Sequence, residues 1–590
     1  MHPSDPKLIW IQYSEKLKKK QTSGNDLIRV GLAGSFTMDP LVPYLGGCLL
    51  KRGIPGLVLS VGPFNQLYQL CFDPAAAFGK DALHGIVLLW RVEDLVPVLL
   101  EKALVGDVQA AESLFEELDR FQSAIHNLRK SFEGTLIIST PPYPSLPSFD
   151  ILEMDQPVAG MMLHNNILRR WTDGLNSIGR IKIIDMNGLL LQEGFACSHD
   201  ARKWYLYKQP YTEAFWAKVG EQTSRIIATE FVSAKKCIVF DCDNTIWGGI
   251  IGEDGLSGIE LGEDFPGNTF RDFQKYLLHL RNRGILLAIA SRNNKEDVVE
   301  VFEKHDAMIL SLDHISVIEA HWNSKVESLK NIAAALNIGT DSLVFIDDNP
   351  KEISEVQARL PEVTCFLVPE EIAFLPNMLR GAGLFDITEI TDEDRARAEM
   401  MKAEQKRKEV SAGQSEEDFL RSLELVINVF EAEPIHMARV TQLINKTNQF
   451  NLTTIRRTQD ELEAMVSIDH THVFTMDMED RFGKYGLVGV AIVKKTSEEE
   501  WFIDTFLMSC RALGRGAETS FLAKIASAVK YYGGKTLRGE YRPTKKNALA
   551  KDFYRNHGFD REDASGQWIA SVDSVKKPSD YVNVSLKLVD

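Results

Sequence analysis

The feature that most constrains the fold is a short apolar run that ends in two carboxylates, Asp241 and Asp243. Two later apolar runs also end in polar residues, and predicted helices separate all three. The predicted strands cover 235–241, 285–290 and 342–346, and the predicted helices cover 267–283 and 324–336. Strands that alternate with helices predict a parallel sheet. Ligands bind at the carboxyl ends of such strands, so we expect a site at Asp241 and Asp243.

The rest of the chain predicts two further units. The first has strands over 28–33, 85–90, 135–139 and 181–185, with helices over 105–132 and 211–229. The last has strands over 485–494 and 501–508 and a helix over 516–532. We therefore expect an α/β protein with domains over 1–230, 231–388 and 418–590, and a charged, exposed helical linker over 389–417.

Composition excludes several classes of protein. The net charge of −16 argues against an extended nucleic-acid surface, which needs a positive face. The seven cysteines include no CxxC pair, which argues against a disulfide framework or a zinc site. The sequence has no run of about 18 apolar residues, so it predicts no membrane span. The first residues do not resemble a signal peptide. We expect a cytoplasmic protein that binds neither nucleic acid nor membrane.

The polar residues at the strand ends suit phosphoryl transfer, which needs a nucleophile, charge neutralisation and a proton shuttle. Asp241 is the candidate nucleophile, which would form an aspartyl-phosphate. Asp243 is the candidate general acid and base. Ser291 and Lys325 would hold the phosphate and stabilise its charge.

Two more carboxylates, Asp347 and Asp348, end the strand over 342–346. Carboxylate oxygens are the ligands that Mg²⁺ prefers. We expect Asp348 to bind the metal directly with Asp347 in support, alongside Asp241 and Asp243.

This ordered set resembles the haloacid-dehalogenase superfamily, whose four motifs are matched by Asp241/Asp243, Ser291, Lys325 and Asp347/Asp348. A narrower resemblance, to the FkbH family of polyketide biosynthesis, covers essentially residues 235–590. It is carried by DNTIWGGIIGEDG after Cys242 and by the segments 447–454, 480–489, 504–516 and 539–544.

The narrower resemblance implies an enzyme that takes the glyceryl unit of 1,3-bisphosphoglycerate. It would load that unit, dephosphorylated, on the phosphopantetheine thiol of an acyl carrier protein, with Mg²⁺ as cofactor. Two alternatives stay open. One is a stand-alone Mg²⁺-dependent phosphatase acting on a small metabolite, and the other is a docking scaffold without catalysis.

Two cysteines are candidates to carry the acyl group. Cys242 lies between the two aspartates, where strand alternation would turn it into the core as a small hydrophobic residue. Cys510 precedes Arg511, and the amides of a following helix would lower the pKa of its thiol. The sequence does not choose between them.

Arg511, Gly514, Arg515 and Gly516 fit the R/Q-x-x-G-x-G/A pattern of the GNAT acetyltransferases. With the later NxxAxxFYxxxGF segment, this resemblance implies an α+β GNAT-like domain whose loop cradles a pyrophosphate or a pantetheine arm. His436 and His557 are possible bases, although isolated histidines are more often structural.

In the first region, Ser35 follows a strand and resembles the nucleophile position of SGNH hydrolases, and Asn65 could match an oxyanion residue. The late Asp-x-x-His of a triad is missing, since Asp185 has no such histidine and His199 with Asp200 has the wrong arrangement. We expect an SGNH- or flavodoxin-like parallel sheet that is degenerate and used for docking.

Overall fold

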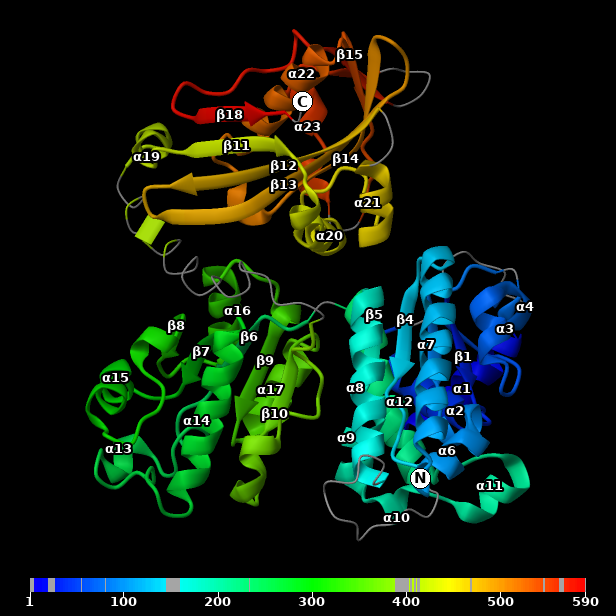
Figure 1. The fold of residues 1–590 in the computed structure, drawn as a ribbon. Coiled ribbons are helices and arrows are strands. Elements are labelled where there is room, and N and C mark those ends of the chain that lie inside the picture. Colours follow the sequence, from blue (N-terminus) through cyan, green and yellow to red (C-terminus); the bar gives the residue numbers. More distant parts are fainter. Residues whose placement is uncertain are drawn as a thin grey trace. The chain divides into compact units, whose positions relative to one another are not determined.

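In the part of the chain that it describes, the computed structural model forms three β-sheets with helices packed against them (Figure 1). It describes residues 5–19, 27–54, 56–79, 81–144, 160–232, 234–387, 403, 406, 407, 410, 414–466, 470–544, 547–561 and 567–588. The chain divides into two compact units, residues 1–233 and 234–590, and the second unit holds two of the sheets. Whether residues 231–388 and 418–590 are separate domains stays a prediction.

The first sheet is parallel and has the order β2-β1-β3-β4-β5. Its strands are β1 (Ile28–Gly34), β2 (Leu57–Val61), β3 (Gly85–Leu89), β4 (Thr135–Ser139) and β5 (Ile181–Ile184). The four predicted strands are confirmed, and β2 was not predicted. Helices α7 (Val108–Ser131) and α8 (Gly160–Ile178) pack on one face, and α2 (Leu41–Lys51) and α12 (Glu213–Phe231) on the other.

Local sequence explains why α7 forms where it does. The Asp107 carboxylate caps the helix by accepting a hydrogen bond from the Ala110 N–H at 3.0 Å. Leu114, Leu118 and Phe121 follow at helical spacing and are fully buried against the sheet.

The second sheet is also parallel, with the order β10-β9-β6-β7-β8. Its strands are β6 (Cys237–Phe240), β7 (Leu286–Ser291), β8 (Val317–Ala320), β9 (Leu343–Asp347) and β10 (Thr364–Leu367). Helices α14 (Gly267–Asn282) and α15 (Lys295–Lys304) cover one face, and α16 (Lys325–Ala335) and α17 (Pro350–Arg359) cover the other. Because β6 pairs with both β7 and β9, the strand order reverses at β6. This is the position at which doubly wound sheets bind ligands.

The third sheet is mixed and has the order β16-β17-β15-β14-β13-β12-β11-β18. Its strands are β11 (Val426–Glu431), β12 (Thr471–Asp480), β13 (Gly483–Lys495), β14 (Glu500–Met508), β15 (Thr536–Gly539), β16 (Asp560–Arg561), β17 (Trp568–Ser571) and β18 (Asn583–Lys587). The predicted strands β13 and β14 and the predicted helix α22 (Ala517–Tyr531) are confirmed. Helix α22 packs on one face, and α20 (Met437–Lys446) and α21 (Gln459–Val466) pack on the other. Two parallel sheets and one mixed sheet confirm the predicted α/β class.

The expectation of an exposed segment over 389–417 is wrong at Arg407. Its side chain is 3% exposed and pairs with the fully buried Asp480 of β12, with Nε 2.7 Å from Oδ2. The Tyr485 hydroxyl donates to the same carboxylate at 2.7 Å, and Ala403 is also buried. A charged segment can therefore dock on the C-terminal sheet through a buried ion pair that composition does not reveal. Most of the segment lies outside the described residues.

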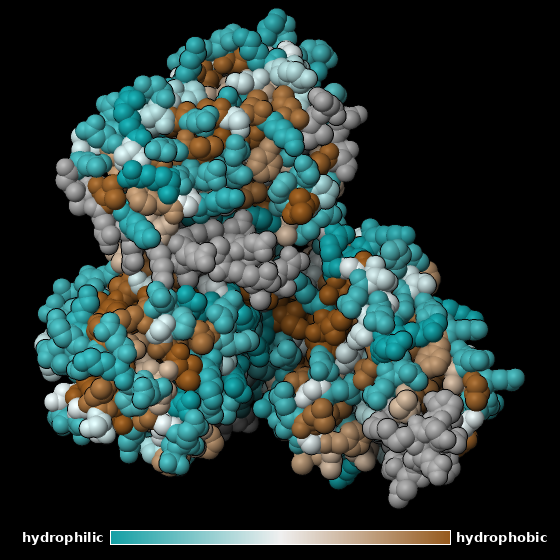
Figure 2. Space-filling model, turned by 60° about the vertical axis from the view of Figure 1, so that its left-hand side comes forward, coloured by the Kyte–Doolittle hydropathy of each residue, from teal (hydrophilic) through white to brown (hydrophobic). Residues whose placement is uncertain are grey.

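The surface in Figure 2 is mostly hydrophilic, with small apolar patches between polar side chains. Among the residues that the structure describes, no helix has both the length and the apolar character needed to span a membrane.

Candidate active site

The candidate site lies at the carboxyl edge of the second sheet. Asp241 follows β6, and its N–H donates to the carbonyl of Ile346 in β9 at 2.9 Å, which anchors its backbone in the sheet. The register pairs Phe240 with Ile289 of β7 and with Ile346. The chain therefore leaves β6, β7 and β9 at neighbouring points, which brings Asp241, Ser291 and Asp347 to the same edge.

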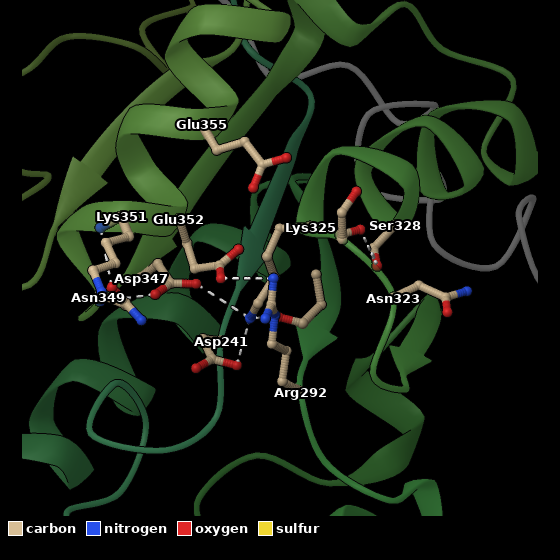
Figure 3. Close-up of polar contacts among 12 residues, drawn as sticks. Asp241, Arg292, Asn323, Lys325, Ser328, Asp347, Asn349, Lys351, Glu352 and Glu355 are labelled. Carbon is tan, nitrogen blue, oxygen red and sulfur yellow. Dashed lines mark hydrogen bonds and ion pairs between the residues drawn. The ribbon is translucent and has the colours of Figure 1, made fainter.

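Lys325 supplies a buried positive charge next to the candidate nucleophile (Figure 3). Its Nζ lies 2.8 Å from Asp241 Oδ1 and 3.2 Å from Asp347 Oδ2, and it donates to the carbonyl of Ala290 at 2.5 Å. The side chain is 3% exposed. Burial by itself would lower the pKa of Lys325, but Asp241 and Asp347 outweigh it and raise the pKa. Lys325 therefore stays charged in the site.

Three carboxylates form a group that could hold a cation. One oxygen each from Asp241, Asp347 and Asp348 lies within 4.8 Å of the others. Burial and then the charge of Asp241 raise the pKa of Asp348. Burial raises the pKa of Asp347 to about 6, with Asp241 adding to the rise and Lys325 opposing it. This mutual repulsion is the electrostatic situation that a bound divalent cation relieves, and the all-oxygen donor set suits a hard cation.

Asp243 lies outside that group, and its oxygens accept hydrogen bonds from three donors. Its Oδ1 accepts from Trp247 Nε1 at 2.9 Å and from the Ile251 N–H at 3.2 Å, and its Oδ2 accepts from Asn293 Nδ2 at 2.9 Å. These contacts fix the orientation of the Asp243 carboxylate, as a proton-transfer role requires. Binding of a metal through the Asp243 side chain stays a prediction.

Sequence reasoning missed Asn293, which links two predicted site residues. Its amide donates to Asp243 Oδ2 and also to Ser291 Oγ at 3.1 Å, and both Ser291 and Asn293 are buried. The available signal was its position, two residues after Ser291 in the loop that leaves β7 at the site.

Cys242 lies beside the site but points into the core. It is fully buried, and burial followed by the charge of Asp241 raises the pKa of its thiol well above the usual value. In this conformation Cys242 is a protonated core residue, in line with the strand-alternation argument. The side chain of Cys510 lies outside the described residues. The other cysteines, at 48, 71, 197, 237 and 365, are free, as is Cys242.

The glycine-rich segment after Asp243 forms a closed loop. Trp247 is fully buried, and Gly248 pairs with Glu260, which closes a loop that contains the short helix α13 (Ile251–Asp254). Gly249 has φ +86°, a conformation that favours glycine at this turn. The segment therefore supports Asp243 through Trp247 and Ile251 in addition to bordering the site.

The predicted loop 511–516 forms a tight turn before α22. Gly514 and Gly516 have φ of +74° and +75°, and α22 begins at Ala517. The Gly514 N–H donates to Glu518 Oε1 at 3.3 Å, and Arg515 lies over the Tyr485 ring at 5.0 Å. The Glu518 carboxylate therefore already accepts a hydrogen bond from the Gly514 N–H, one of the amides that would face a bound anion. A cofactor role for Arg511, Gly514, Arg515 and Gly516 stays a prediction.

The two candidate histidine bases are both held by structural contacts. His557 is buried, its Nε2 lies 2.9 Å from Thr519 Oγ1, and its Nδ1 lies 2.6 Å from the carbonyl of Phe553. His436 Nδ1 accepts a hydrogen bond from the Glu433 N–H at 3.1 Å.

Ser35 does not have the surroundings of a hydrolase nucleophile. It is 1% exposed, its hydroxyl donates to Asp94 Oδ2 at 2.8 Å, and its oxygen accepts from the Arg91 N–H at 3.1 Å. Arg91 binds the same carboxylate through Nε at 2.9 Å. Among the described residues, Ser35 Oγ contacts a carboxylate and not a histidine. Asn65 has φ +52° and donates its N–H to the carbonyl of Gly34.

Comparison with known proteins gives a structural match over most of the chain. The N-terminal part of the protein BF1531 from Bacteroides fragilis, containing a phosphatase domain complexed with Mg, is 25% identical with a TM-score of 0.55. The match covers 64% of this chain and 99% of that chain.

Other solved structures match about a quarter of the chain. Ard1 from Thermoplasma volcanium is 17% identical over 25% of this chain and 97% of that chain, with a TM-score of 0.20. A GNAT-family acetyltransferase from Streptococcus pneumoniae is 15% identical over 25% of this chain and 98% of that chain, with a TM-score of 0.20. No protein-family model and no curated protein sequence matches the chain.

Proposed function

We propose that this chain is a Mg²⁺-dependent phosphatase of the haloacid-dehalogenase type, with Asp241 as nucleophile. The observation that carries the proposal is the convergence of Asp241, Lys325, Asp347 and Asp348 at the switch point of a parallel sheet. The structural similarity to the BF1531 phosphatase domain, which was crystallised with Mg, supports it.

Asp241, Asp347 and Asp348 would hold the Mg²⁺, because their oxygens lie close together and suit a hard cation. When bound, the cation would neutralise the negative charge of the phosphate and of the carboxylates. Lys325 supplies a fixed positive charge 2.8 Å from Asp241 Oδ1. Ser291, at the end of β7, would donate a hydrogen bond to a phosphate oxygen.

The reaction has two balanced steps. First, an Asp241 oxygen attacks phosphorus, the P–O bond of the ester breaks, and the leaving oxygen takes a proton from Asp243. Second, Asp243 takes a proton from water, the water oxygen attacks phosphorus, and the bond to Asp241 breaks to release phosphate. The three hydrogen bonds to Asp243 hold it in position for both proton transfers.

The test is phosphate release from p-nitrophenyl phosphate by the full chain. Activity is expected with Mg²⁺ and is expected to be lost after chelation and in Asp241→Asn. Exposed Asp272→Asn on α14 serves as the matched control, because among the described residues Asp272 pairs with Lys275 on the surface. Activity that persists in Asp241→Asn would overturn the proposal.

The FkbH resemblance motivates a narrower proposal, in which dephosphorylation is coupled to loading of a glyceryl unit from 1,3-bisphosphoglycerate on an acyl carrier protein. Because Cys242 is buried and protonated, Cys510 is the better candidate for an enzyme-bound thioester, and direct transfer to the carrier is the alternative. The loop 511–516 would then hold the pantetheine arm, and residues 1–230 would dock partners.

Intact-protein mass spectrometry tests the narrower proposal. The chain is incubated with 1,3-bisphosphoglycerate and Mg²⁺, with and without a holo-acyl carrier protein, together with Cys242→Ala and Cys510→Ala. A glyceryl mass on the carrier is expected, with any enzyme adduct lost in Cys510→Ala. Phosphate release without an adduct on either protein would leave the stand-alone phosphatase, and activity that survives deletion of 418–590 would favour it further.

A further inference from the structure

A short connecting loop, residues 321–324, joins the edge strand β8 to Lys325. β8 ends at Ala320, and Lys325 is the first residue of α16. β8 pairs with β7, and Ala320 lies opposite Ser291 in the register. The loop therefore begins beside Ser291 and has to direct the Lys325 side chain back across β7 to Asp241, which follows β6.

Core packing fixes β8 less firmly than the central strands. Every residue of β7 is buried, whereas every residue of β8 is half-buried. In α16, Leu329 and Ile332 are fully buried against the sheet. This packing keeps the helix on the face of the sheet, but the hydrophobic effect has no preferred direction. Hydrogen bonds are directional, so they are better suited to fix where the first residue of α16 lies.

The imidazole of His321 joins the connecting loop to the strand before it. Its Nδ1 accepts a hydrogen bond from the Asn323 N–H at 3.2 Å, and its Nε2 lies 2.9 Å from Glu319 Oε2. Because the Asn323 N–H can only donate, Nδ1 carries no proton and Nε2 donates to the carboxylate. The backbone N–H of His321 also donates to the carbonyl of Ser291 at 3.1 Å. One neutral tautomer of His321 thus ties the loop to both β8 and β7.

Glu319 extends these contacts to α16. The same oxygen, Oε2, accepts a hydrogen bond from Asn331 Nδ2 at 3.0 Å, and Asn331 lies in the second turn of the helix. Ser324 caps the helix, since its Oγ accepts from the Glu327 N–H at 3.3 Å. The side chains of Glu319 and His321 are 21% and 31% exposed, so solvent reaches them only in part. One carboxylate of the edge strand therefore holds both the loop and the helix.

These contacts lead to the position of the Lys325 ammonium. Its Nζ lies 2.8 Å from Asp241 Oδ1 and donates to the carbonyl of Ala290 at 2.5 Å, so a small displacement of the helix would break both contacts. The Asn323 side chain points away from Lys325 and Asp241 (Figure 3), and it is the Asn323 backbone that bonds His321.

We infer that Glu319 and His321 are positioning residues, which place the Lys325 ammonium against Asp241 by fixing the connecting loop and α16. The effect on catalysis rests on the proposed phosphatase function. The placement of Lys325 does not, because it can be measured without turnover.

Hydrolysis of p-nitrophenyl phosphate by the full chain tests the effect on catalysis. His321→Ala is expected to lower kcat by about 10-fold with a smaller change in KM, because side chains that orient a catalytic group typically contribute this much. His321→Gln keeps a donor near the position of Nε2 and is expected to recover part of kcat. The double variant of His321→Ala with Glu319→Ala is expected to lose little more than either single variant, since the two residues act through one contact.

Acetylation of Lys325 by acetic anhydride, followed by mass spectrometry of peptides, measures its placement without turnover. In the wild-type chain this side chain is 3% exposed and is expected to react slowly. His321→Ala and Glu319→Ala are expected to label Lys325 roughly 3-fold faster, because a loop that is held less firmly opens more often. Exposed Lys330 on the same helix is the internal reference, and its unchanged labelling excludes general unfolding. His279→Ala, at an exposed position on α14, is the matched control and should behave as wild type in both assays.

Unchanged labelling of Lys325 in both alanine variants would overturn the inference, whatever their kcat, because the two residues would then not act through Lys325. Additive losses of kcat in the double variant would also overturn it, since the residues would then act separately. A wild-type chain without Asp241-dependent hydrolysis would overturn the proposed function, and the labelling of Lys325 would still decide the inference.

Discussion

The side-chain amide of Asn293 donates a hydrogen bond to Asp243 Oδ2 at 2.9 Å, across 50 residues of sequence. The same amide nitrogen lies 3.1 Å from Ser291 Oγ. One buried amide therefore fixes the candidate acid–base carboxylate relative to the candidate phosphate-binding hydroxyl. This geometry predicts that Asn293 positions Asp243 without itself contacting the reacting atoms.

Replacement of Asn293 by alanine is expected to lower kcat for p-nitrophenyl phosphate by about 10- to 100-fold, with a smaller change in KM, because partners that orient a catalytic group typically contribute this much. Steady-state kinetics measures both constants. Asn294→Ala is the control, since Asn294 is the exposed neighbour that bonds Asp297 on the surface. A change in KM alone would contradict a positioning role.

The three-carboxylate group predicts a specific effect on metal affinity. Asp348→Asn removes one negative charge from the group and is expected to raise the Mg²⁺ concentration for half-maximal activity by roughly 10-fold or more. Titration of a chelated chain with Mg²⁺ measures the shift. Asp272→Asn is expected to show the wild-type midpoint, and an unchanged midpoint in Asp348→Asn would remove this residue from the metal site.

The sequence predicted the strands that carry the site because those strands are buried on both faces. In β6 and β9 every residue is buried, so each appears as a continuous apolar run. β8 and β10 consist of half-buried and exposed residues, and they were missed because they lie at the edges of the sheet, where no such run is required.

The same distinction applies to the site. Asp241 and Asp347 were predicted because each stands at the end of an apolar run. Asn293 and His321 were missed, because their roles depend on how separate segments meet and not on a local pattern. The burial of Arg407 was missed because a charged segment predicts an exposed helix. Only the structure shows that Asp480 is buried opposite Arg407 and pairs with it.

Loss of the buried ion pair between Arg407 and Asp480 is expected to destabilise the C-terminal sheet strongly. Arg407→Ala would leave the fully buried Asp480 carboxylate without its counter-charge, and is expected to lower the free energy of unfolding of the C-terminal sheet by about 3–5 kcal/mol. Urea unfolding of the full chain, followed by hydrogen exchange of peptides from β12, measures the change. Arg421→Ala, which removes a solvent-exposed pair with Asp580, is expected to leave stability nearly unchanged, because exposed ion pairs contribute little.

Asp480→Asn with Arg407→Ala gives a second measure of the same contact. Removing both charges together is expected to cost less than Arg407→Ala alone, because no buried charge is left without a partner. Equal losses in the double and single variants would show that the packing of residue 407, and not its charge, stabilises the sheet.

His164 predicts how the stability of the first unit depends on pH. It is 5% exposed on α8, and burial lowers its pKa from 6.5 to about 4. Between these values the unfolded chain binds more protons than the folded chain, so the free energy of unfolding falls as the pH drops from 6.5 towards 4. The loss between pH 7 and pH 5 is expected to be about 2 kcal/mol.

Hydrogen exchange of peptides from α8, in the full chain at pH 7 and pH 5 and corrected for intrinsic exchange rates, measures this loss. His164→Phe cannot gain a proton and is expected to remove most of the pH dependence. His126→Phe, an exposed position on the adjacent α7, is the control and should retain it. If His164→Phe and wild type lose protection equally at pH 5, protonation of another group opens this unit.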